Sequence, residues 1–350
     1  MSDQPYASVV IPCLNEAAHI GACLDALASQ QGAEPGFEVL VVDGGSDDGT
    51  REILGRRTET DRWLRVLDNP ERITPVAMNM GIDAANADVV IILGAHAEVA
   101  PDFVRRNLEA LRAHPESACV GGVVEQVHGD ELSRRIGLAL SSPFGVGDAR
   151  FRTGGVAGHV DTVAFGAYRK VVLDELSGFD AALVRNQDDE LNFRLTETGW
   201  RIWFDPRIRS TYHARSTYGQ LFRQYRQYGF WKVFVNKKHL TVTTWRQLAP
   251  AAMLLGTAVL AILSCAHGAF PNAAPFLTLA LPALATLWGM WILGALIAVA
   301  LAGIPLKDVL GVMRTFFVLH MAYGWGYCEG IWRLVLMRRA PSADFKSLTR

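Results

Sequence analysis

A stretch of 60 residues, 247–306, contains no Asp, Glu, Lys or Arg. About 20 apolar residues are enough for a helix to cross a bilayer, and a soluble core helix does not need so long a run without charge. We therefore expect two membrane spans, at residues 248–270 and 276–304, joined by a turn at 271–275. The alternative is a very apolar soluble helical domain.

A third apolar segment, residues 309–328, differs from the first two because it contains Arg314 and His320. Three further arginines, at positions 333, 338 and 339, follow it. A full crossing would place these arginines outside, against the tendency of Lys and Arg to remain on the cytoplasmic side. We therefore expect this segment to be interfacial or re-entrant within a membrane domain of residues 247–340, followed by a tail at 341–350.

Residues 217–246 interleave aromatic side chains with Arg and Lys, immediately before the first expected span. This pattern is typical of a helix that lies in the membrane interface. The positive charges also predict orientation, because Lys and Arg accumulate on the cytoplasmic side of membrane proteins. We expect a multi-pass protein of the inner, cytoplasmic membrane, with the residues before the first span facing the cytoplasm. The polar start of the chain shows no secretory signal pattern.

The charge and cysteine content exclude some other functions. The 34 Lys and Arg nearly balance the 35 Asp and Glu, so no nucleic-acid partner is indicated. The five cysteines are scattered without paired spacing, which indicates a reducing compartment rather than a disulfide framework or a zinc site.

Residues 1–125 alternate short apolar runs with helical patterns, which is typical of βαβ units and a mainly parallel, Rossmann-like sheet. The predicted strands are 8–12, 37–43, 64–68, 89–93 and 119–124, and the predicted helices are 17–30, 50–59, 75–85 and 101–114. Ligands of such sheets bind beyond the carboxyl ends of the strands. The residues that follow each run are therefore the candidates for a site.

The later part of this α/β region has a weaker pattern. Residues 126–160 are rich in Gly, and we expect a mobile loop there. Order is expected to return with strands at 162–166 and 200–204 and with helices at 170–176 and 188–199.

The first two strands are followed by polar residues that suit a nucleoside. Asp43 ends the second strand, where its carboxylate could accept a hydrogen bond from N3–H of uracil, although a plain turn before a capped helix is the simpler alternative. Asn15 and Glu16 follow the first strand, in position to contact base and ribose or to cap the next helix.

Further candidates follow the later strands. His96 and Glu98 come after the fourth strand and could hold a divalent cation on a diphosphate, although a single His is more often structural. Arg72 could reach a phosphate, or it could be a solvated surface residue. Asp188 lies in an acidic run at the start of a helix, where acids also occur simply because the helix dipole favours them.

Four motifs in this order resemble those of the inverting family-2 glycosyltransferases of the GT-A fold. They are residues 12–16, 43–50, 79–81 and 187–199. More narrowly, residues 94–97 and 186–190 are similar to the succinoglycan-biosynthesis glucosyltransferases, which are membrane enzymes that extend a lipid-linked oligosaccharide. The resemblance implies a GT-A catalytic domain at residues 1–216, followed by the transmembrane helices.

The resemblance also implies roles for individual residues. The sugar nucleotide would be bound by Pro12, Asn15, Glu16, Asp43, Ser46, Arg72, Asn79 and Gln187. Asp188 would be the catalytic base, and His96 would occupy the second acidic place of the Asp-x-Asp metal motif that holds Mg²⁺ or Mn²⁺. Gly94 stands where the subfamily usually has Asp, and Glu98 or His213 could compensate for the missing carboxylate.

The function expected from this resemblance is inverting transfer of a sugar, namely glucose, from a UDP-sugar. The expected acceptor is a saccharide linked to polyprenyl diphosphate, in exopolysaccharide or other surface polysaccharide synthesis. Two alternatives remain: a polyprenyl-phosphate glycosyltransferase, and a non-catalytic membrane-bound subunit that binds sugar nucleotides. A nicotinamide-dependent oxidoreductase is excluded because no Gly-x-Gly-x-x-Gly opens the first helix.

Overall fold

The computed structural model describes residues 5–32, 36–213, 217–243, 245–269, 275–342 and 345, without the side chains of residues 213, 275 and 276. Most of the turn predicted at 271–275 therefore lies outside the described residues. The chain divides into two compact units. The first combines Met1–Val127 with Asp148–His213, and the second combines His128–Gly147 with Ala214–Arg350. Residues 128–147, which we had expected in the catalytic domain, thus group with the C-terminal residues.

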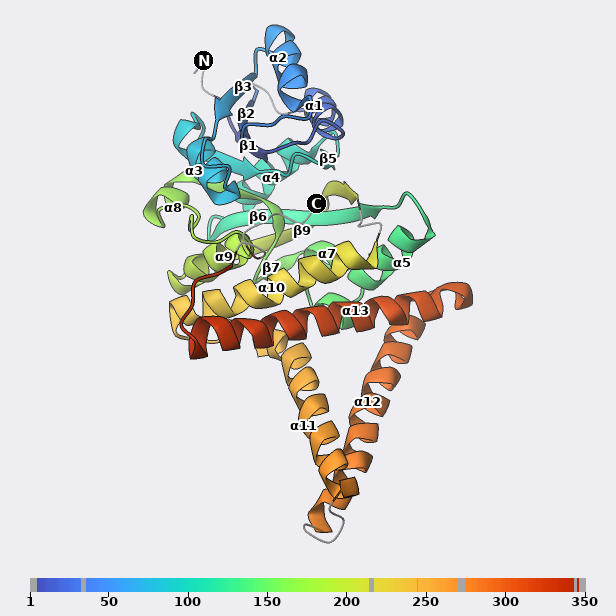
Figure 1. Cartoon of the computed structure of the whole chain (residues 1–350). Helices are drawn as coiled ribbons and strands as arrows, with labels where there is room; N and C mark the ends of the chain where they lie inside the picture. The colour runs from blue at the N-terminus through green and yellow to red at the C-terminus, as the bar shows by residue number, and fades with distance from the viewer. Residues whose placement is uncertain are drawn as a thin grey trace. The chain divides into compact units, whose positions relative to one another are not determined.

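The first unit is built on one sheet, which has nine strands among the described residues, in the order β3-β2-β1-β4-β8-β6-β9-β5 with β7 paired to β9 (Figure 1). The strands are β1 (Ser8–Cys13), β2 (Glu38–Asp43), β3 (Leu64–Asp68), β4 (Val89–Ile92), β5 (Ala97–Val99), β6 (Ser117–Val127), β7 (Gly158–Val160), β8 (Ala164–Arg169) and β9 (Arg201–His213). Strands β1 to β4 are parallel, as are β6 and β9, whereas β8, β5 and β7 join the sheet antiparallel. The expected Rossmann-like architecture is confirmed.

Apolar residues bury both faces of this sheet, because successive residues of a strand point to opposite sides. In β1, Val9 and Ile11 face one core cluster and Val10 faces the other. Helices cover both faces, which is why the inner strands are continuously apolar rather than alternating. The helices of this unit are α1 (Ile20–Ala28), α2 (Thr50–Thr60), α3 (Thr74–Ala84), α4 (Phe103–Ala113), α7 (Arg150–Thr153), α8 (Lys170–Glu175) and α9 (Gln187–Glu197).

The loop predicted at residues 126–160 was wrong. Strand β6 continues to Val127, and the segment also forms α5 (Glu131–Leu140), α6 (Pro143–Val146), α7 and β7. Helix α5 begins with a capping box, in which Asp130 and Ser133 exchange hydrogen bonds. Buried Ile136 and Leu140 lie four residues apart, a helical signal that the neighbouring glycines obscured.

The second unit is helical and contains α5, α6, α10 (Tyr218–His239), α11 (Ala249–Ala269), α12 (Ala280–Leu301) and α13 (Leu306–Gly330). Short 3₁₀ helices lie at Trp245–Leu248 and Pro275–Leu279, and a π-helix follows α13 at Ile331–Leu336. Helices α10 and α13 lie side by side (Figure 1). Glycine allows the close approach, because a Cβ on Gly229 or Gly326 would meet the carbonyl oxygen of Tyr323 or Arg226. The basic aromatic region expected at 217–246 is thus largely one helix packed on α13.

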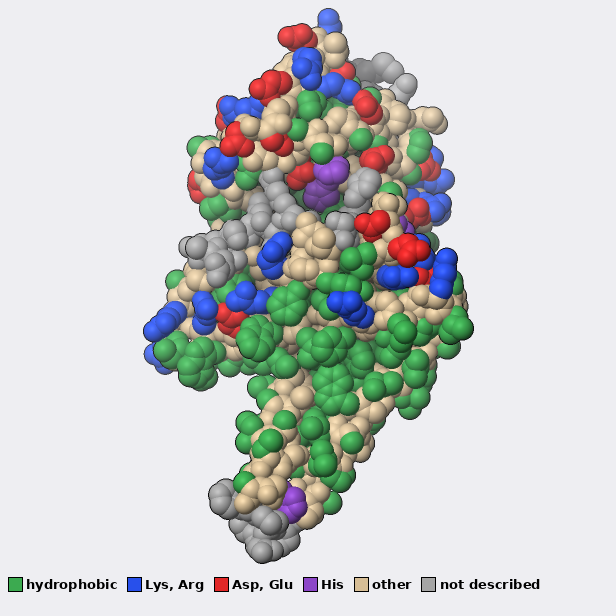
Figure 2. All heavy atoms as spheres, turned by 45° about the vertical axis from the view of Figure 1, so that its right-hand side comes forward, with side chains coloured by type: hydrophobic (Ala, Val, Ile, Leu, Met, Phe, Trp, Pro, Cys, Tyr) green, Lys and Arg blue, Asp and Glu red, His purple; other side chains and the backbone are tan. Residues whose placement is uncertain are grey.

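Two described segments, Trp245–Ala269 and Leu277–Leu301, are long and apolar enough to cross a membrane. Few of their side chains are buried, and Figure 2 shows hydrophobic side chains along both helices with no Lys, Arg, Asp or Glu on the face drawn. They match the expected spans by length and composition. Helix α13 is not a third such segment within the described residues; it buries Phe316 and Leu319 while exposing Leu310, Phe317 and Trp325. Its interfacial or re-entrant placement stays a prediction.

Candidate active site

The loops after β1 and β2 are joined by hydrogen bonds between their polar residues. The N–H of Asn15 donates to Oγ of Ser46 at 2.7 Å, and Oδ1 of Asn15 accepts from the N–H of Asp47 at 2.8 Å. The N–H of Glu16 donates to Oγ1 of Thr50 at 2.8 Å. Asn15 has a left-handed φ of 54°, which Asn tolerates better than most residues. Asn15 and Ser46 therefore build the loops that place Glu16 at the carboxyl edge of the sheet.

Asp43, the last residue of β2, is only 1% exposed. Its Oδ2 accepts from the N–H groups of Gly45 and Ser46 at 3.1 Å and from Nε of Arg51 at 2.7 Å, and its Oδ1 accepts from the Ser46 hydroxyl. Burial favours the neutral acid, but the hydrogen bonds from Ser46 and Arg51 outweigh it and lower the pKa of Asp43. Asp43 is therefore ionised. Each carboxylate oxygen has about two acceptor positions, and because the Ser46 hydroxyl uses one of those on Oδ1, the other can accept from a further donor.

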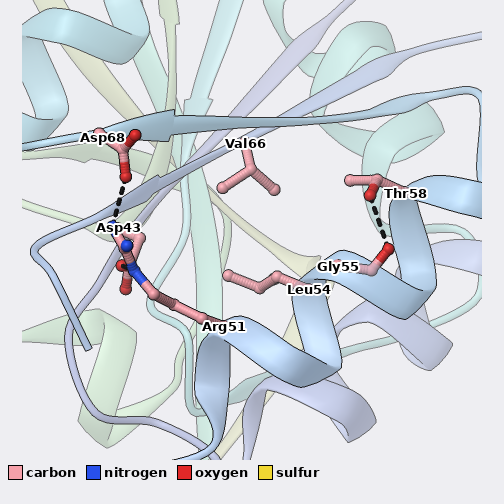
Figure 3. A pocket seen from close by; sticks show the side chains of 7 residues that line it. All are labelled: Asp43, Arg51, Leu54, Gly55, Thr58, Val66 and Asp68. Carbon is pink, nitrogen blue, oxygen red and sulfur yellow. Dashed lines mark hydrogen bonds and ion pairs between the residues drawn. The ribbon is translucent and has the colours of Figure 1, made fainter. Parts of the chain in front are cut away.

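A pocket of about 210 Å³ opens beside Asp43, between β2, β3 and α2 (Figure 3). It is lined by Asp43, Arg51, Leu54, Gly55, Thr58, Val66 and Asp68. Arg51 forms ion pairs with both Asp43 and Asp68, and Figure 3 shows its side chain reaching toward these two carboxylates. Arg51 and Asp68 were not among the site residues predicted from the sequence. Asp68 was detectable because it ends a predicted strand, whereas Arg51 lies on a helix and only the register of α2 brings it here.

Arg72 and Pro12 lie at the same edge of the sheet. The N–H of Arg72 donates to the carbonyl of Asn69, whose own N–H donates to the carbonyl of Asp43 at 2.8 Å. A Cβ on Gly44 would lie 3.5 Å from Cα of Arg72, so the two turns are in contact. The Arg72 side chain is exposed, and Pro12 is half-buried within β1. The structure therefore places both residues beside the Asp43 turn.

Asn79 was expected to contact the sugar nucleotide, but its amide is used inside the protein. Its Nδ2 donates to the carbonyl of Phe179, and its Oδ1 accepts from the N–H of the same residue, each at 2.8 Å. These bonds tie α3 to the turn before α9. Gly178 in that turn has a φ of 63° and no room for a Cβ beside Asn79. We therefore leave Asn79 out of the site proposed below.

His96 follows β4 and lies close to Glu16, with Nδ1 and Oε1 separated by 3.5 Å. The rings of Tyr212 and His19 stand edge-on to His96, at centroid distances of 5.0 Å and 6.5 Å. Imidazole and carboxylate both suit Mn²⁺. Within the described part of the chain, no group of three or more His, Cys, Asp or Glu could hold a metal. These two side chains therefore fit a divalent cation only as part of a shell that diphosphate oxygens would complete.

Two further residues were expected near the metal. Glu98 is exposed on β5, opposite Thr211 of β9. His213 ends β9, and its side chain lies outside the described residues. Gly94, the place of the missing carboxylate, is next to the ring of Phe165: a Cβ on Gly94 would lie 3.2 Å from its Cε1. Phe165 could not be predicted from the sequence, because no local pattern links it to Gly94.

Asp188 lies in the first turn of α9, one residue after Gln187, which begins the helix. The Asp188 side chain is exposed to solvent, although many protein atoms lie around its carboxylate. Two causes raise the pKa of Asp188 to about 6: the larger is partial loss of solvation, and the smaller is the negative charge of Asp189. A carboxylate with a pKa near 6 is still mostly ionised at pH 7 and accepts a proton more readily than an ordinary Asp.

Comparisons with known proteins identify the family of the chain. The family model described as glycosyl transferase family 2 matches residues 8–177. The succinoglycan biosynthesis protein ExoA of Rhizobium meliloti is 33% identical over 248 residues, which cover 70% of this chain and 74% of that protein. The dolichyl N-acetyl-alpha-D-glucosaminyl phosphate 3-beta-D-2,3-diacetamido-2,3-dideoxy-beta-D-glucuronosyltransferase of Methanococcus voltae is 28% identical over 247 residues, covering 69% of this chain and 77% of that enzyme.

Among solved structures, the mannosyltransferase PcManGT from Pyrobaculum calidifontis, in complex with GDP-Man and Mn²⁺, aligns with a TM-score of 0.63. The sequence identity is 22%, and the alignment covers 95% of this chain and 88% of that one. This likeness concerns the fold, and the family model and the ExoA relative carry the assignment. The chain belongs to glycosyl transferase family 2, with a GT-A fold, and is a glycosyltransferase.

Proposed function

We propose that the enzyme transfers a sugar, namely glucose, with inversion from a UDP-sugar to a lipid-linked saccharide at the cytoplasmic face of a membrane. The observation that carries this proposal is the pair of carboxylates in the first unit. Asp43 is held ionised at the end of β2, and Asp188 is tuned to a pKa of about 6 at the start of α9. The Asp43 carboxylate suits a fixed hydrogen-bond acceptor for the nucleobase. The Asp188 carboxylate suits a proton acceptor in the reaction.

The order of the strands suggests how the donor lies. Strands β2, β1 and β4 are neighbours, and Asp43, Pro12 and His96 stand at or just after their ends. With uracil at Asp43, the ribose would cross β1 and the diphosphate would reach His96 and Glu16. Arg72, exposed beside the Asp43 turn, would contact a phosphate or the base.

His96 and Glu16 would hold a divalent cation, Mg²⁺ or Mn²⁺, together with the diphosphate. A bound cation of this kind would neutralise charge that develops on the departing UDP. The protein itself contributes the orientation of these ligands, because Glu16 is fixed by its N–H bond to Thr50 and His96 by the rings of Tyr212 and His19.

Asp188 would perform the proton transfer. As the acceptor hydroxyl oxygen bonds to the anomeric carbon, its proton passes to Asp188, and the bond from that carbon to the phosphate oxygen breaks to release UDP. A single displacement of this kind inverts the anomeric configuration. Helix α9 gives the base a rigid position, since Arg194 fixes the helix to the turn before it.

The acceptor would be presented by the membrane. The two apolar helices, α11 and α12, would anchor the chain, with α10 and the exposed apolar face of α13 lying at the interface. The names of the two relatives support a lipid-linked substrate and surface polysaccharide synthesis, because one acts on a dolichyl-linked sugar phosphate and the other belongs to succinoglycan biosynthesis. We extend this to an acceptor linked through polyprenyl diphosphate.

The test is a donor panel on membranes that contain the full chain. Membranes would be incubated with radiolabelled UDP-glucose, other UDP-sugars and GDP-mannose, and the lipid fraction would then be extracted. We expect UDP-glucose to label a lipid-linked saccharide with the wild type but not with Asp188→Asn. Labelling by GDP-mannose alone would overturn the proposed donor. A wild type that binds UDP but transfers nothing would favour the non-catalytic alternative.

The second candidate is a polyprenyl-phosphate glycosyltransferase, which differs only in the acceptor. The same assay separates the two when purified polyprenyl phosphate is compared with a polyprenyl-diphosphate saccharide. Labelling of the first acceptor alone would favour this alternative.

A further inference from the structure

The neighbouring ring of Phe165, and not the backbone conformation, limits the side chain that fits at position 94. Gly94 is not among the glycines with positive φ, so an L-residue would fit its conformation. Its surroundings are crowded instead: a Cβ would lie 3.2 Å from Cε1 of Phe165 and 3.8 Å from Cε1 of His96. A Cβ contact of 3.2 Å is tighter than nine in ten real ones, so the ring would have to shift by a few tenths of an ångström. The ring of Phe165 thus occupies the space that a side chain at position 94 would enter.

Phe165 reaches this place through an unusual backbone conformation. It lies at the start of β8, which runs antiparallel to β4 with Ala167 opposite Ile91. Its φ is 50°, a region that bulky residues rarely adopt and that is concentrated at functional sites. The ring is partly buried and packs against the core cluster beneath the sheet. A strained aromatic residue is therefore fixed beside His96, at the carboxyl edge of β4.

This edge is where the ribose of the donor would pass, given the donor placement proposed above. The nucleoside would run from Asp43 on β2 across β1 to His96 after β4, and Gly94 precedes His96 by two residues. A carboxylate at position 94 would offer acceptors to the ribose hydroxyls. An aromatic ring offers none, and it presents an apolar surface to the C–H groups of a sugar.

We propose that Phe165, with Gly94, forms an apolar wall on the ribose side of the donor site and makes Phe165 a specificity-determining residue. The enzyme then recognises the base and the diphosphate while forming no hydrogen bond from position 94 to the ribose. This inference rests on the proposed function, because it uses the placement of the nucleotide. Removal of a ribose hydroxyl should therefore cost the wild type less affinity than it costs a variant with a carboxylate at position 94.

The test measures binding of UDP, 2′-deoxy-UDP and 3′-deoxy-UDP to the full chain in detergent by calorimetry. For the wild type, we expect the three dissociation constants to agree within about threefold, since no charged hydrogen bond is lost. Phe165→Ala should weaken all three by about fivefold, because an aromatic contact is removed without changing polar recognition. Gly94→Asp/Phe165→Ala should bind UDP about tenfold or more tightly than one deoxy analogue, because a carboxylate then meets the ribose.

Matched variants separate this effect from a loss of folding. Gly94→Asp alone should lower the melting temperature, and the added Phe165→Ala should recover part of that loss, because the ring no longer obstructs the new side chain. Phe37→Ala removes another partly buried ring that packs on the same core cluster, and it should not change UDP binding. Gly21→Ala, where a Cβ meets nothing within 4 Å, controls for the glycine substitution.

Two results would overturn the inference. One is a wild type that already rejects a deoxy analogue by tenfold or more, and the other is a folded Phe165→Ala variant with unchanged affinity for UDP. If the proposed donor nucleotide were wrong, the wild type would bind GDP and not UDP. The ribose analogues would then be compared as GDP and 2′-deoxy-GDP. A folded wild type that binds neither nucleotide would overturn both proposals.

Discussion

The carboxylate of Glu190 accepts hydrogen bonds at 2.9 to 3.1 Å from Arg194, one turn further along α9. Glu190 is fully buried, and Arg194 also donates to the carbonyls of Leu176 and Gly178. The three acidic residues 188–190 therefore have different roles. Glu190 orients Arg194, which fixes the helix to the preceding turn, while Asp188, two residues before Glu190, keeps access to solvent.

The first prediction concerns Asp188 as the general base. Asp188→Asn keeps the shape of the side chain but cannot take a proton, so transfer should fall by ~10²–10⁴-fold. UDP binding should be retained, because the nucleotide contacts are assigned to the loops after β1, β2 and β3. The measurement is initial rate of sugar transfer together with calorimetry of UDP.

Neighbouring residues provide the controls for this prediction. Asp189→Asn should have a smaller effect, since a helix turns each residue by about 100° relative to the one before. Glu190→Gln should lower the melting temperature, because it leaves Arg194 without its ionic partner. If Asp188→Asn retained normal transfer while Asp189→Asn lost it, the base would be misassigned. If all three variants remained active, the acidic run would be a structural helix start.

The second prediction concerns the dependence of activity on pH. The pKa of Asp188 is raised to about 6, and only its ionised form can act as a base. The value of kcat/KM should therefore fall as pH decreases through about 6, by up to about tenfold per pH unit, and should level off at higher pH. Asp189→Asn should shift this acid limb to lower pH, because the neighbouring charge helps to raise the pKa. An acid limb that does not move would show that Asp189 does not influence the base.

The third prediction concerns the nucleoside end of the site. Asp43→Asn removes an ionised acceptor, and UDP affinity should fall by about 10- to 100-fold, as expected for a hydrogen bond to a charged group. Arg51→Gln tests whether the neighbouring pocket takes part. It should raise the pKa of Asp43 and weaken UDP binding less than Asp43→Asn does, because Ser46 still donates to the carboxylate. Equal affinity of the wild type and Asp43→Asn for UDP would exclude Asp43 from the nucleoside site.

The sequence predicted the elements whose signals are local. The strands ending at Asp43 and Asp68 were placed within a residue of their true bounds, because short apolar runs between polar turns are unambiguous. Strand β5 was missed because its three residues directly follow the turn after β4 and carry no periodicity. Helix α5 was missed because glycines on both sides hid its amphipathic pattern.

The candidate site could be outlined from the sequence because the polar residues at strand ends are also a local signal. Residues at strand ends, such as Asp43 and His96, could be found because the topology fixes where those ends meet. Contacts between distant segments could not be read from the chain. The ring of Phe165 beside Gly94 depends on the antiparallel register of β8 with β4, which no local pattern specifies.

The fourth prediction concerns membrane attachment. Replacing residues 249–304 with a flexible linker removes α11 and α12 while α13 stays packed on α10. The linker must reach from the start of α11, where Pro250 contacts Gly324, to the start of α13. These points are 18 residues apart along α13, about 27 Å, which about 15 flexible residues can span.

This variant should be released largely from membranes, with the remainder removed by high salt, because the basic helix α10 would still bind anionic lipid. Wild-type protein should require detergent, as measured by fractionation and quantitative blotting. Wild-type protein that stays soluble without detergent would show that α11 and α12 do not anchor the chain.

The fifth prediction concerns the identity of the cation. His96 supplies an imidazole where the resemblance leads us to expect a carboxylate, and imidazole binds Mn²⁺ and Co²⁺ better relative to Mg²⁺ than a carboxylate does. In the presence of UDP, the wild type should therefore bind Mn²⁺ more tightly than Mg²⁺ in calorimetric titrations. His96→Asp should narrow this difference, because a hard oxygen ligand improves the site for Mg²⁺.

Removal of divalent cations with EDTA should weaken UDP binding by the wild type, and Glu16→Gln should reduce the effect of EDTA because one charged ligand is already lost. His159→Gln is the matched control, since His159 lies on β7 against Trp203 and Glu116 rather than beside Glu16. If His96→Asp left the ratio of Mn²⁺ to Mg²⁺ affinity unchanged, His96 would not be a ligand of the cation, and its place between Glu16 and Tyr212 would be structural.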